Sequence, residues 1–218
     1  MSISVDRPPV FTLFNYFRSS ASYRVRIALN LKGIKPARIV DLDIREGQQK
    51  AQALLDVIPH GLVPAISWAD GSLTQSLAII EWLDALDPAS PRLIPADPTE
   101  AAHVREIALA IACDIHPVNN LRVLNYLVDE LGASDETKLR WYRHWVEEGF
   151  AAVERILARR RGRHRFALTD QPSLADICIV PQVFNARRFD VDLSPYPNVL
   201  GVSTNCEALE PFEQAKPR

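Results

Sequence analysis

Hydroxyl and amide side chains stand at two places where the sequence predicts a helix to begin, Ser19-Ser20 and Gln75-Ser76. A hydroxyl at a helix N-terminus caps free backbone N–H groups. It can equally donate a hydrogen bond to a thiolate and lower its pKa, and the positive end of the helix dipole suits a carboxylate. For both pairs, the sequence is compatible with a capping role and with a ligand-binding role.

The elements that must position these side chains alternate between strand and helix over the first 86 residues. Short β-branched and aromatic runs predict strands at residues 10–14, 37–42, 63–68 and 72–74. Cap residues and apolar spacing predict helices from Ser19-Ser20 to Gly33, at 46–57 and at 77–86. This β-α-β-α-β-β-α order is the layout of an α/β thioredoxin-like domain.

Thioredoxin-like domains usually exchange thiols and disulfides through a cysteine at the start of the first helix. The first cysteine in this chain is Cys113, so protein-based redox exchange in this domain is excluded. A reactive thiol would have to come from a bound small molecule. Val63-Pro64 opens the predicted third strand, where such domains use a cis proline to present backbone groups to an extended peptide ligand.

A proline-rich segment separates this domain from the rest of the chain. Residues 87–98 hold four of the sixteen prolines, and long helical patterns follow at 99–129, 134–160 and 172–189. Ser173 and Asp176 fit a capping box at the start of the last pattern. We therefore expect a thioredoxin-like domain at residues 1–86, a linker at 87–98 and an all-helical domain at 99–218.

The composition narrows the classes of function. The 218 residues include 25 basic and 27 acidic side chains, whereas a nucleic-acid or anionic-membrane partner would demand a basic surplus. No apolar run approaches the ~18 residues of a membrane span. The three cysteines form no CxxC motif and lie near no histidine cluster, so we expect a reduced, cytoplasmic protein without a metal site.

Four segments carry more specific patterns than the order of elements. They are FRSSASYRVRIALNLKG at 17–33, DGSLTQSLAIIEWL at 70–83, CDIHPVNN at 113–120 and VPQVFNARRFDVDLSPYP at 180–197. In this order they resemble blocks of the zeta-class glutathione transferases, the family of maleylacetoacetate and maleylpyruvate isomerases. The resemblance implies the glutathione transferase fold, in which the all-α C-terminal domain completes the substrate site.

The resemblance also implies a glutathione-dependent cis–trans isomerase of aromatic or amino-acid catabolism, which converts a maleyl substrate to its fumaryl isomer. A thiolate that adds to the conjugated double bond lets it rotate, and elimination then regenerates glutathione as a cofactor. The protein would lower the thiol pKa and stabilise enolate and carboxylate charge. Ser19 and Ser20 are expected to do the first. Arginine suits the second because its planar fork pairs with carboxylates, and the candidates are Arg18, Arg122 and Arg188.

The residues expected to hold glutathione are His60, Val63, Pro64, Gln75, Ser76, His116, Asn119 and Asn120. His116 and Asn120 are four residues apart, so on a helix they would face the same way. Pro117 should kink that helix. His60 stands where relatives often carry glutamine, and an exposed loop residue is an equally open interpretation. Cys113 lies in an apolar pattern and is expected in the core.

One departure from the family pattern bears on the activity, because Ala21 stands where the family often has cysteine. Its absence weakens activities that need a protein thiol, such as reductive dehalogenation, but leaves isomerisation possible. Two alternatives stay open: a glutathione transferase or dehalogenase acting on small α-haloacids, and a non-catalytic binding module. The expected partners are glutathione, a small dicarboxylate substrate and a second copy of the chain in a homodimer.

Overall fold

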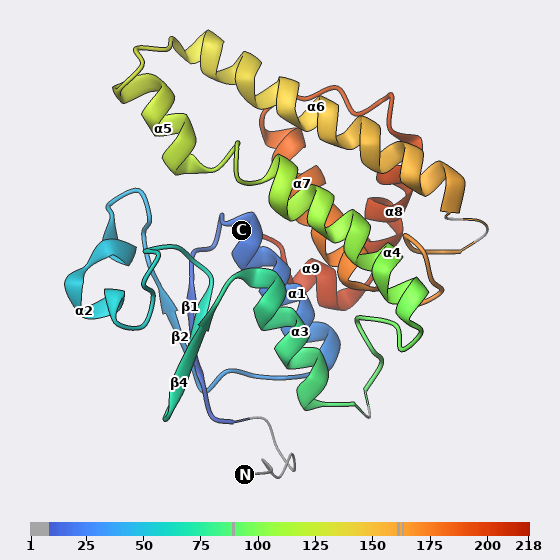
Figure 1. Ribbon diagram of the computed structural model, residues 1–218, viewed down its shortest axis with the longest axis horizontal. Helices are drawn as coiled ribbons and strands as arrows, with labels where there is room; N and C mark the ends of the chain where they lie inside the picture. Colours follow the sequence, from blue (N-terminus) through green and yellow to red (C-terminus); the bar gives the residue numbers. More distant parts are fainter. Residues whose placement is uncertain (1–8, 89, 161, 163) are drawn as a thin grey trace. The chain divides into compact units, whose positions relative to one another are not determined.

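The structure is a computed structural model that describes residues 9–88, 90–160, 162 and 164–218. The chain forms two compact units (Figure 1). The first unit contains the residues up to Ile94 together with Leu209–Arg218, and the second is Pro95–Ala208. Residues 1–8, which the sequence assigns to the first domain, lie outside the described part.

The first unit has the predicted order of strands and helices around a mixed four-stranded sheet. Its strands are β1 (Thr12–Asn15), β2 (Arg38–Asp41), β3 (Ala65–Trp68) and β4 (Gly71–Thr74). They lie in the order β2-β1-β3-β4, with β1 and β2 parallel and the other pairs antiparallel. Helices α1 (Ser20–Lys32) and α3 (Ser76–Leu86) pack side by side on one side of this sheet, and the short α2 (Gln52–Leu55) lies on the other (Figure 1).

The helix predicted at residues 46–57 is much shorter than its sequence pattern indicates. Only a 3-10 turn, η1 (Gln48–Lys50), and the single turn of α2 form there. Gly47 adopts the left-handed region with φ 71°, and Ala51 is extended between the two turns. Apolar side chains of this segment, including Leu54, pack against a small cluster around Phe14. The conformation of this segment is therefore set by its packing against the sheet and not by its helix propensity.

The C-terminal residues return to the first unit, which the expected domain boundary at 99–218 does not include. Helix α9 (Glu210–Ala215) packs on α1. The buried Tyr23 donates a hydrogen bond to the carbonyl of Phe212, and Asn30 donates one to that of Pro211. These groups lie about 180 residues apart in sequence, and no local pattern marks the pairing.

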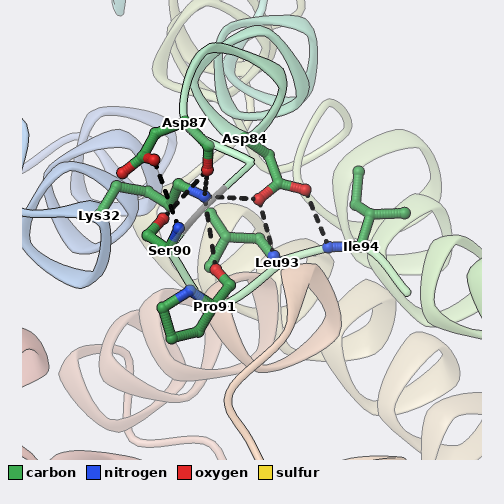
Figure 2. A network of polar contacts seen from close by, with 7 residues as sticks. All are labelled: Lys32, Asp84, Asp87, Ser90, Pro91, Leu93 and Ile94. Carbon is green, nitrogen blue, oxygen red and sulfur yellow. Dashed lines mark hydrogen bonds and ion pairs between the residues drawn. The ribbon is translucent and has the colours of Figure 1, made fainter. Parts of the chain in front are cut away.

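A buried ion pair joins the start of the proline-rich segment to the first unit (Figure 2). Lys32 Nζ lies 3.0 Å from Asp84 Oδ1 and also donates to the carbonyl of Asp87 at 2.8 Å. Asp84 in turn accepts from the backbone N–H groups of Leu93 and Ile94. The first unit therefore runs to Ile94, and the boundary differs from the expected end at residue 86.

The second unit is built of helices, as the sequence predicts. They are α4 (Pro98–Leu109), the π-helix η2 (Ala110–Ile115), α5 (Leu121–Asp129), α6 (Asp135–Arg160), α7 (Leu174–Arg188) and α8 (Pro197–Glu207). Helix α7 is almost wholly buried and packs against α4 and α8. Its predicted capping box is confirmed, because the Ser173 side chain accepts from the backbone N–H of Asp176 and the Asp176 carboxylate accepts from the N–H of Ser173. The predicted fold class is confirmed in both units.

The continuous helix predicted at residues 99–129 is wrong. Helix α4 passes into the π-helix, in which the N–H of His116 bonds to the carbonyl of Ile111, five residues back. Pro117 has no N–H to continue the ladder, and residues 116–120 form a turn. Asn120 then caps the new helix α5. The proline thus ends the helix where the sequence predicts only a kink.

Candidate functional site

The start of α1 presents Ser19 as the predicted thiol-activating hydroxyl. Ser19 is the N-cap residue, and its Oγ accepts a hydrogen bond from the N–H of Ser22 at 3.2 Å. A hydroxyl that accepts through a lone pair still has its own hydrogen to donate. The half-buried Ser19 can therefore cap the helix and serve an anion at the same time.

The two neighbours of Ser19 differ in accessibility. Ser20 is the first residue of α1 and only 5% exposed, whereas Arg18 is exposed and lies over the ring of Phe17. Ser20 is thus less accessible to a ligand than Ser19. The guanidinium of Arg18 is open to an anion beside the helix start.

The loop before β3 has the backbone that the thioredoxin-like layout predicts. The Val63–Pro64 peptide bond is cis, which the sequence alone left open. Val63 is half-buried and Pro64 is buried, while His60 is an exposed turn residue. The open interpretation of His60 as a loop residue agrees with this exposure.

The start of α3 carries an unusual backbone at Gln75. Its φ of 71° lies in a region that side chains other than glycine rarely adopt, and its exposed side chain makes no capping hydrogen bond. Strained residues of this kind gather at ligand sites. The next residue, Ser76, begins the helix and is 6% exposed. Gln75 occupies the N-cap position, so Ser76 is not the helix cap.

Ser76 has a buried partner that the sequence does not reveal. Arg24, on the second turn of α1 and only 1% exposed, donates from Nη1 to Ser76 Oγ at 3.3 Å. This contact brings the two helix starts into one polar arrangement across 52 residues of sequence. A hydroxyl that accepts from Arg24 keeps its hydrogen for another acceptor.

In the second unit the predicted contacts lie on the turn between the π-helix and α5, so the argument that His116 and Asn120 share a helix face is wrong. His116 is half-buried directly after the π-helix. Asn120 Oδ1 accepts from the N–H of Arg122 and caps α5. The side chain of Arg122 is exposed in the first turn of α5.

Asn119 is the buried member of this turn, 9% exposed. Its Nδ2 donates to the carbonyl of Tyr142 on α6 at 3.2 Å. Its Oδ1 has no hydrogen-bond partner among the described residues. A buried acceptor left in this way costs free energy unless a ligand or water supplies a donor.

Arg188 lies at the end of α7, close to Tyr142 of α6. It is exposed, and its Nη1 donates to Asn185 Oδ1 at 3.2 Å. The ring of the next residue, Phe189, stacks on Tyr142 with centroids 3.8 Å apart. Arg143 Nε donates to the carbonyl of Phe189 at 3.0 Å. Tyr142 therefore contacts the segments of two predicted site residues, Asn119 and Arg188.

The electrostatics of this region keep Tyr142 neutral. Burial raises the pKa of Tyr142 well above that of free tyrosine, and the nearby charge of Arg188 and a hydrogen bond with Gln182 only partly oppose the shift. The phenol thus remains protonated at physiological pH. Arg24, Tyr142 and Arg143 are the residues that sequence reasoning missed, because only contacts across 23 to 52 positions reveal them.

The cysteines offer no buried nucleophile. Burial, and secondarily the charge of Asp176, raise the pKa of the Cys206 thiol, and Cys178 is buried. Cys113 is exposed, so its expected core position is wrong. Within residues 9–88, 90–160, 162 and 164–218, no group of three His, Cys, Asp or Glu side chains could hold a metal ion.

Family models match both units. The N-terminal domain of glutathione S-transferase matches residues 18–86, and its C-terminal domain matches residues 140–204. A probable maleylacetoacetate isomerase of Vibrio cholerae is 47% identical over 94% of this chain and 94% of that protein. The chain belongs to the zeta-class glutathione S-transferase family.

Solved structures of zeta-class relatives agree with the fold. The holo structure of a maleylpyruvate isomerase, a bacterial zeta-class enzyme, superposes with a TM-score of 0.90 at 42% identity, covering 94% of this chain and 96% of that one. A maleylacetoacetate isomerase of Anaeromyxobacter dehalogenans, with dicarboxyethyl glutathione and citrate in its active site, gives 0.82 at 34% identity over 98% and 93%. Separately, no helix of the described residues is long and apolar enough to cross a membrane.

Proposed function

We propose that this chain is a glutathione-dependent cis–trans isomerase that acts on a maleyl substrate, either maleylpyruvate or maleylacetoacetate. One observation carries the proposal: a thioredoxin-like unit without cysteine places the Ser19 hydroxyl at the N-terminus of α1, with its hydrogen still available. Such a helix start suits a thiolate brought by a ligand. The names of the relatives support the same reaction.

The residues of the first unit fit a peptide thiol such as glutathione. The exposed amide of Gln75 is not used for capping, and Ser76 stands at a helix start that favours a carboxylate. The cis Val63–Pro64 bond and His60 add backbone and side-chain contacts to this set. We propose that these residues, together with His116, Asn119 and Asn120, hold glutathione. Asn120 Oδ1 also caps α5.

Glutathione, when bound, supplies a thiolate that adds reversibly to the conjugated double bond and so permits rotation. Ser19 donates to this sulfur and lowers its pKa, with Ser20 in a secondary role. Arg18 and Arg188 are both exposed and permanently charged, so they can pair with the carboxylates of the substrate. Arg122 is the third candidate for these carboxylates. No protein thiol is required, which suits Ala21 at the position of the family cysteine.

The test is the loss of the maleyl chromophore in the presence of glutathione. We expect turnover of many substrate equivalents for each glutathione, with no net loss of free thiol. Stoichiometric thiol consumption with α-haloacids, and none of this isomerisation, would instead establish the transferase or dehalogenase alternative. Absence of binding to immobilised glutathione would leave only the non-catalytic module.

We also propose a homodimer and a cytoplasmic location. Family resemblance supports the dimer, and the three dispersed cysteines support a reducing compartment. Sedimentation of the purified full chain tests the first, and fractionation of the source cell tests the second. A monomer at micromolar concentration would overturn the dimer.

A further inference from the structure

The turn that carries His116 and Asn119 follows an uncommon backbone element. The π-helix Ala110–Ile115 ends where the N–H of His116 bonds to the carbonyl of Ile111 at 2.9 Å. A π-helical turn is rare and is often found at functional sites. Such a turn needs contacts from outside to hold it, since Pro117 cannot extend the hydrogen-bond ladder.

Helix α6 supplies those contacts at three points. The indole Nε1 of Trp141 donates to the carbonyl of Val118 at 2.9 Å, and the carbonyl of Tyr142 accepts from Asn119 at 3.2 Å. The third point is Gly149, two helical turns beyond Tyr142 and so on the same side of α6. The segment Ile115–Asn119 is thus attached to about 12 Å of α6.

Gly149 makes the third attachment possible because it has no side chain. A Cβ built on Gly149 would overlap with Cγ1 and Cδ1 of Ile115, the last residue of the π-helix. Ile115 is fully buried and β-branched, so its side chain has few rotamers and would have to displace packed neighbours to move away. The same Cβ would lie 3.6 Å from Cβ of Ile115, which is an ordinary contact.

We infer that Trp141 and Gly149 are positioning residues, which hold the Ile115–Asn119 segment so that His116 and Asn119 can contact the ligand. The inference rests on the proposed role of these two residues in binding glutathione. The buried Oδ1 of Asn119, which lacks a partner among the described residues, is the acceptor that this arrangement presents. Neither Trp141 nor Gly149 needs to touch the ligand.

Two tryptophans of α6 provide a matched test. Trp141→Phe removes the hydrogen bond to Val118 and keeps an aromatic ring. Trp145→Phe is the same substitution one turn away, but it removes no hydrogen bond, because Nε1 of Trp145 is buried without a partner in the described part of the chain. Titration calorimetry of the full chain should show glutathione affinity about fivefold weaker for Trp141→Phe and within about twofold of wild type for Trp145→Phe. Equal changes in the two variants would overturn the inference.

Gly149→Ala directly tests the close contact between Gly149 and Ile115, and we expect it to weaken glutathione binding about tenfold or more. Alanine is the better helix former, so a purely local effect would stabilise the chain and leave affinity unchanged. Ile115→Ala removes both overlapping atoms, and the double variant should therefore regain affinity relative to Gly149→Ala. A double variant no better than Gly149→Ala would contradict the inference. If Gly149→Ala does not fold, the tryptophan pair still decides.

Amide hydrogen exchange separates this inference from the proposed function. In Gly149→Ala the N–H of His116 should exchange faster than in the wild type, and the double variant should slow it again. Glutathione binding without isomerisation by the wild type would overturn the proposed function and leave the inference standing. Unchanged exchange at His116 in Gly149→Ala would overturn the inference even in an active isomerase.

Discussion

The two units position their candidate ligand residues in different ways. In the first unit the local backbone positions Ser19 and Gln75. Ser19 caps α1 through the N–H of Ser22, three residues away, and Gln75 begins α3 with a positive φ. In the second unit Asn119 and the end of α7 depend on Tyr142 and on Arg143, 23 and 46 residues away respectively. Substitutions at Ser19 and Gln75 should therefore act locally, whereas those at the second-unit candidates should act through α6.

The largest effect is expected for Ser19→Ala in the first unit. It removes the hydroxyl proposed to stabilise the thiolate, so kcat/KM should fall about 100-fold or more. The pKa of the bound thiol should rise, as measured by ultraviolet thiolate absorbance against pH. Loss of the cap should also cost about 1 kcal/mol of stability.

Ser20→Ala and Ser19→Thr are the controls for this substitution. Ser20 is buried, so its loss should change the thiol pKa less. Ser19→Thr retains both the cap and the donor and should stay near wild type. A bound thiol whose pKa is the same in Ser19→Ala as in wild type would refute the role of Ser19.

The next effect is expected for Arg188→Ala in the second unit. Loss of the proposed charge-assisted hydrogen bond between Arg188 and a substrate carboxylate should raise KM for maleylpyruvate about tenfold or more. A neutral electrophile such as a haloalkane is the comparison substrate, and its KM should not change. Equal increases for both substrates would remove Arg188 from carboxylate binding.

Arg143→Met would sharpen the contrast between the units. Methionine keeps the unbranched apolar part of the side chain but cannot donate to the carbonyl of Phe189, which lies next to Arg188. KM for maleylpyruvate should rise in the same direction as in Arg188→Ala, by about three- to tenfold. In the double variant Arg143→Met/Arg188→Ala the two effects should be less than additive. Full additivity would show that Arg143 acts independently of Arg188.

Gln75→Gly should change stability and binding in opposite directions. Glycine tolerates φ 71°, so relief of backbone strain should raise the free energy of unfolding by roughly 1 kcal/mol. Loss of the amide should weaken glutathione binding. Gln75→Ala is the matched control, because it also loses the amide but keeps the strain. Equal stability of the two variants in urea would contradict the strain assignment.

The smallest effect is expected for Tyr142→Phe and depends on pH. Burial raises the pKa of Tyr142 in the folded chain above its unfolded value of about 10. Above that pH the unfolded phenol loses its proton while the folded one keeps it, so wild-type stability falls as pH rises. The Tyr142→Phe variant has no phenol at this position, so its stability does not fall with pH for this reason. The stability advantage of wild type, about 1 kcal/mol at neutral pH, should therefore shrink toward pH 10.5, and a pH-independent difference would oppose the assignment.

The local signals in the sequence were enough for most of the first unit. The order of strands and helices and the helix starts at Ser19 and Gln75 depend on neighbours within a few residues, whereas the cis isomer of Val63–Pro64 became evident only in the structure. The helix expected at 46–57 failed, since packing against Phe14 and its neighbours competes with helix propensity. The long helix at 99–129 failed because Pro117 breaks it and Asn120 restarts it.

The sequence by itself determined the fold class, the absence of a cysteine at the first helix and the identity of the charged and hydroxyl candidates. Only the tertiary structure showed that Arg24 supports Ser76, that α9 returns to α1, and that Gly149 admits Ile115. Caps, turns and strand patterns arise from interactions between neighbours in the chain, which a sequence displays. Contacts between distant positions arise when buried surfaces pack together, and their partners are fixed only in the folded chain.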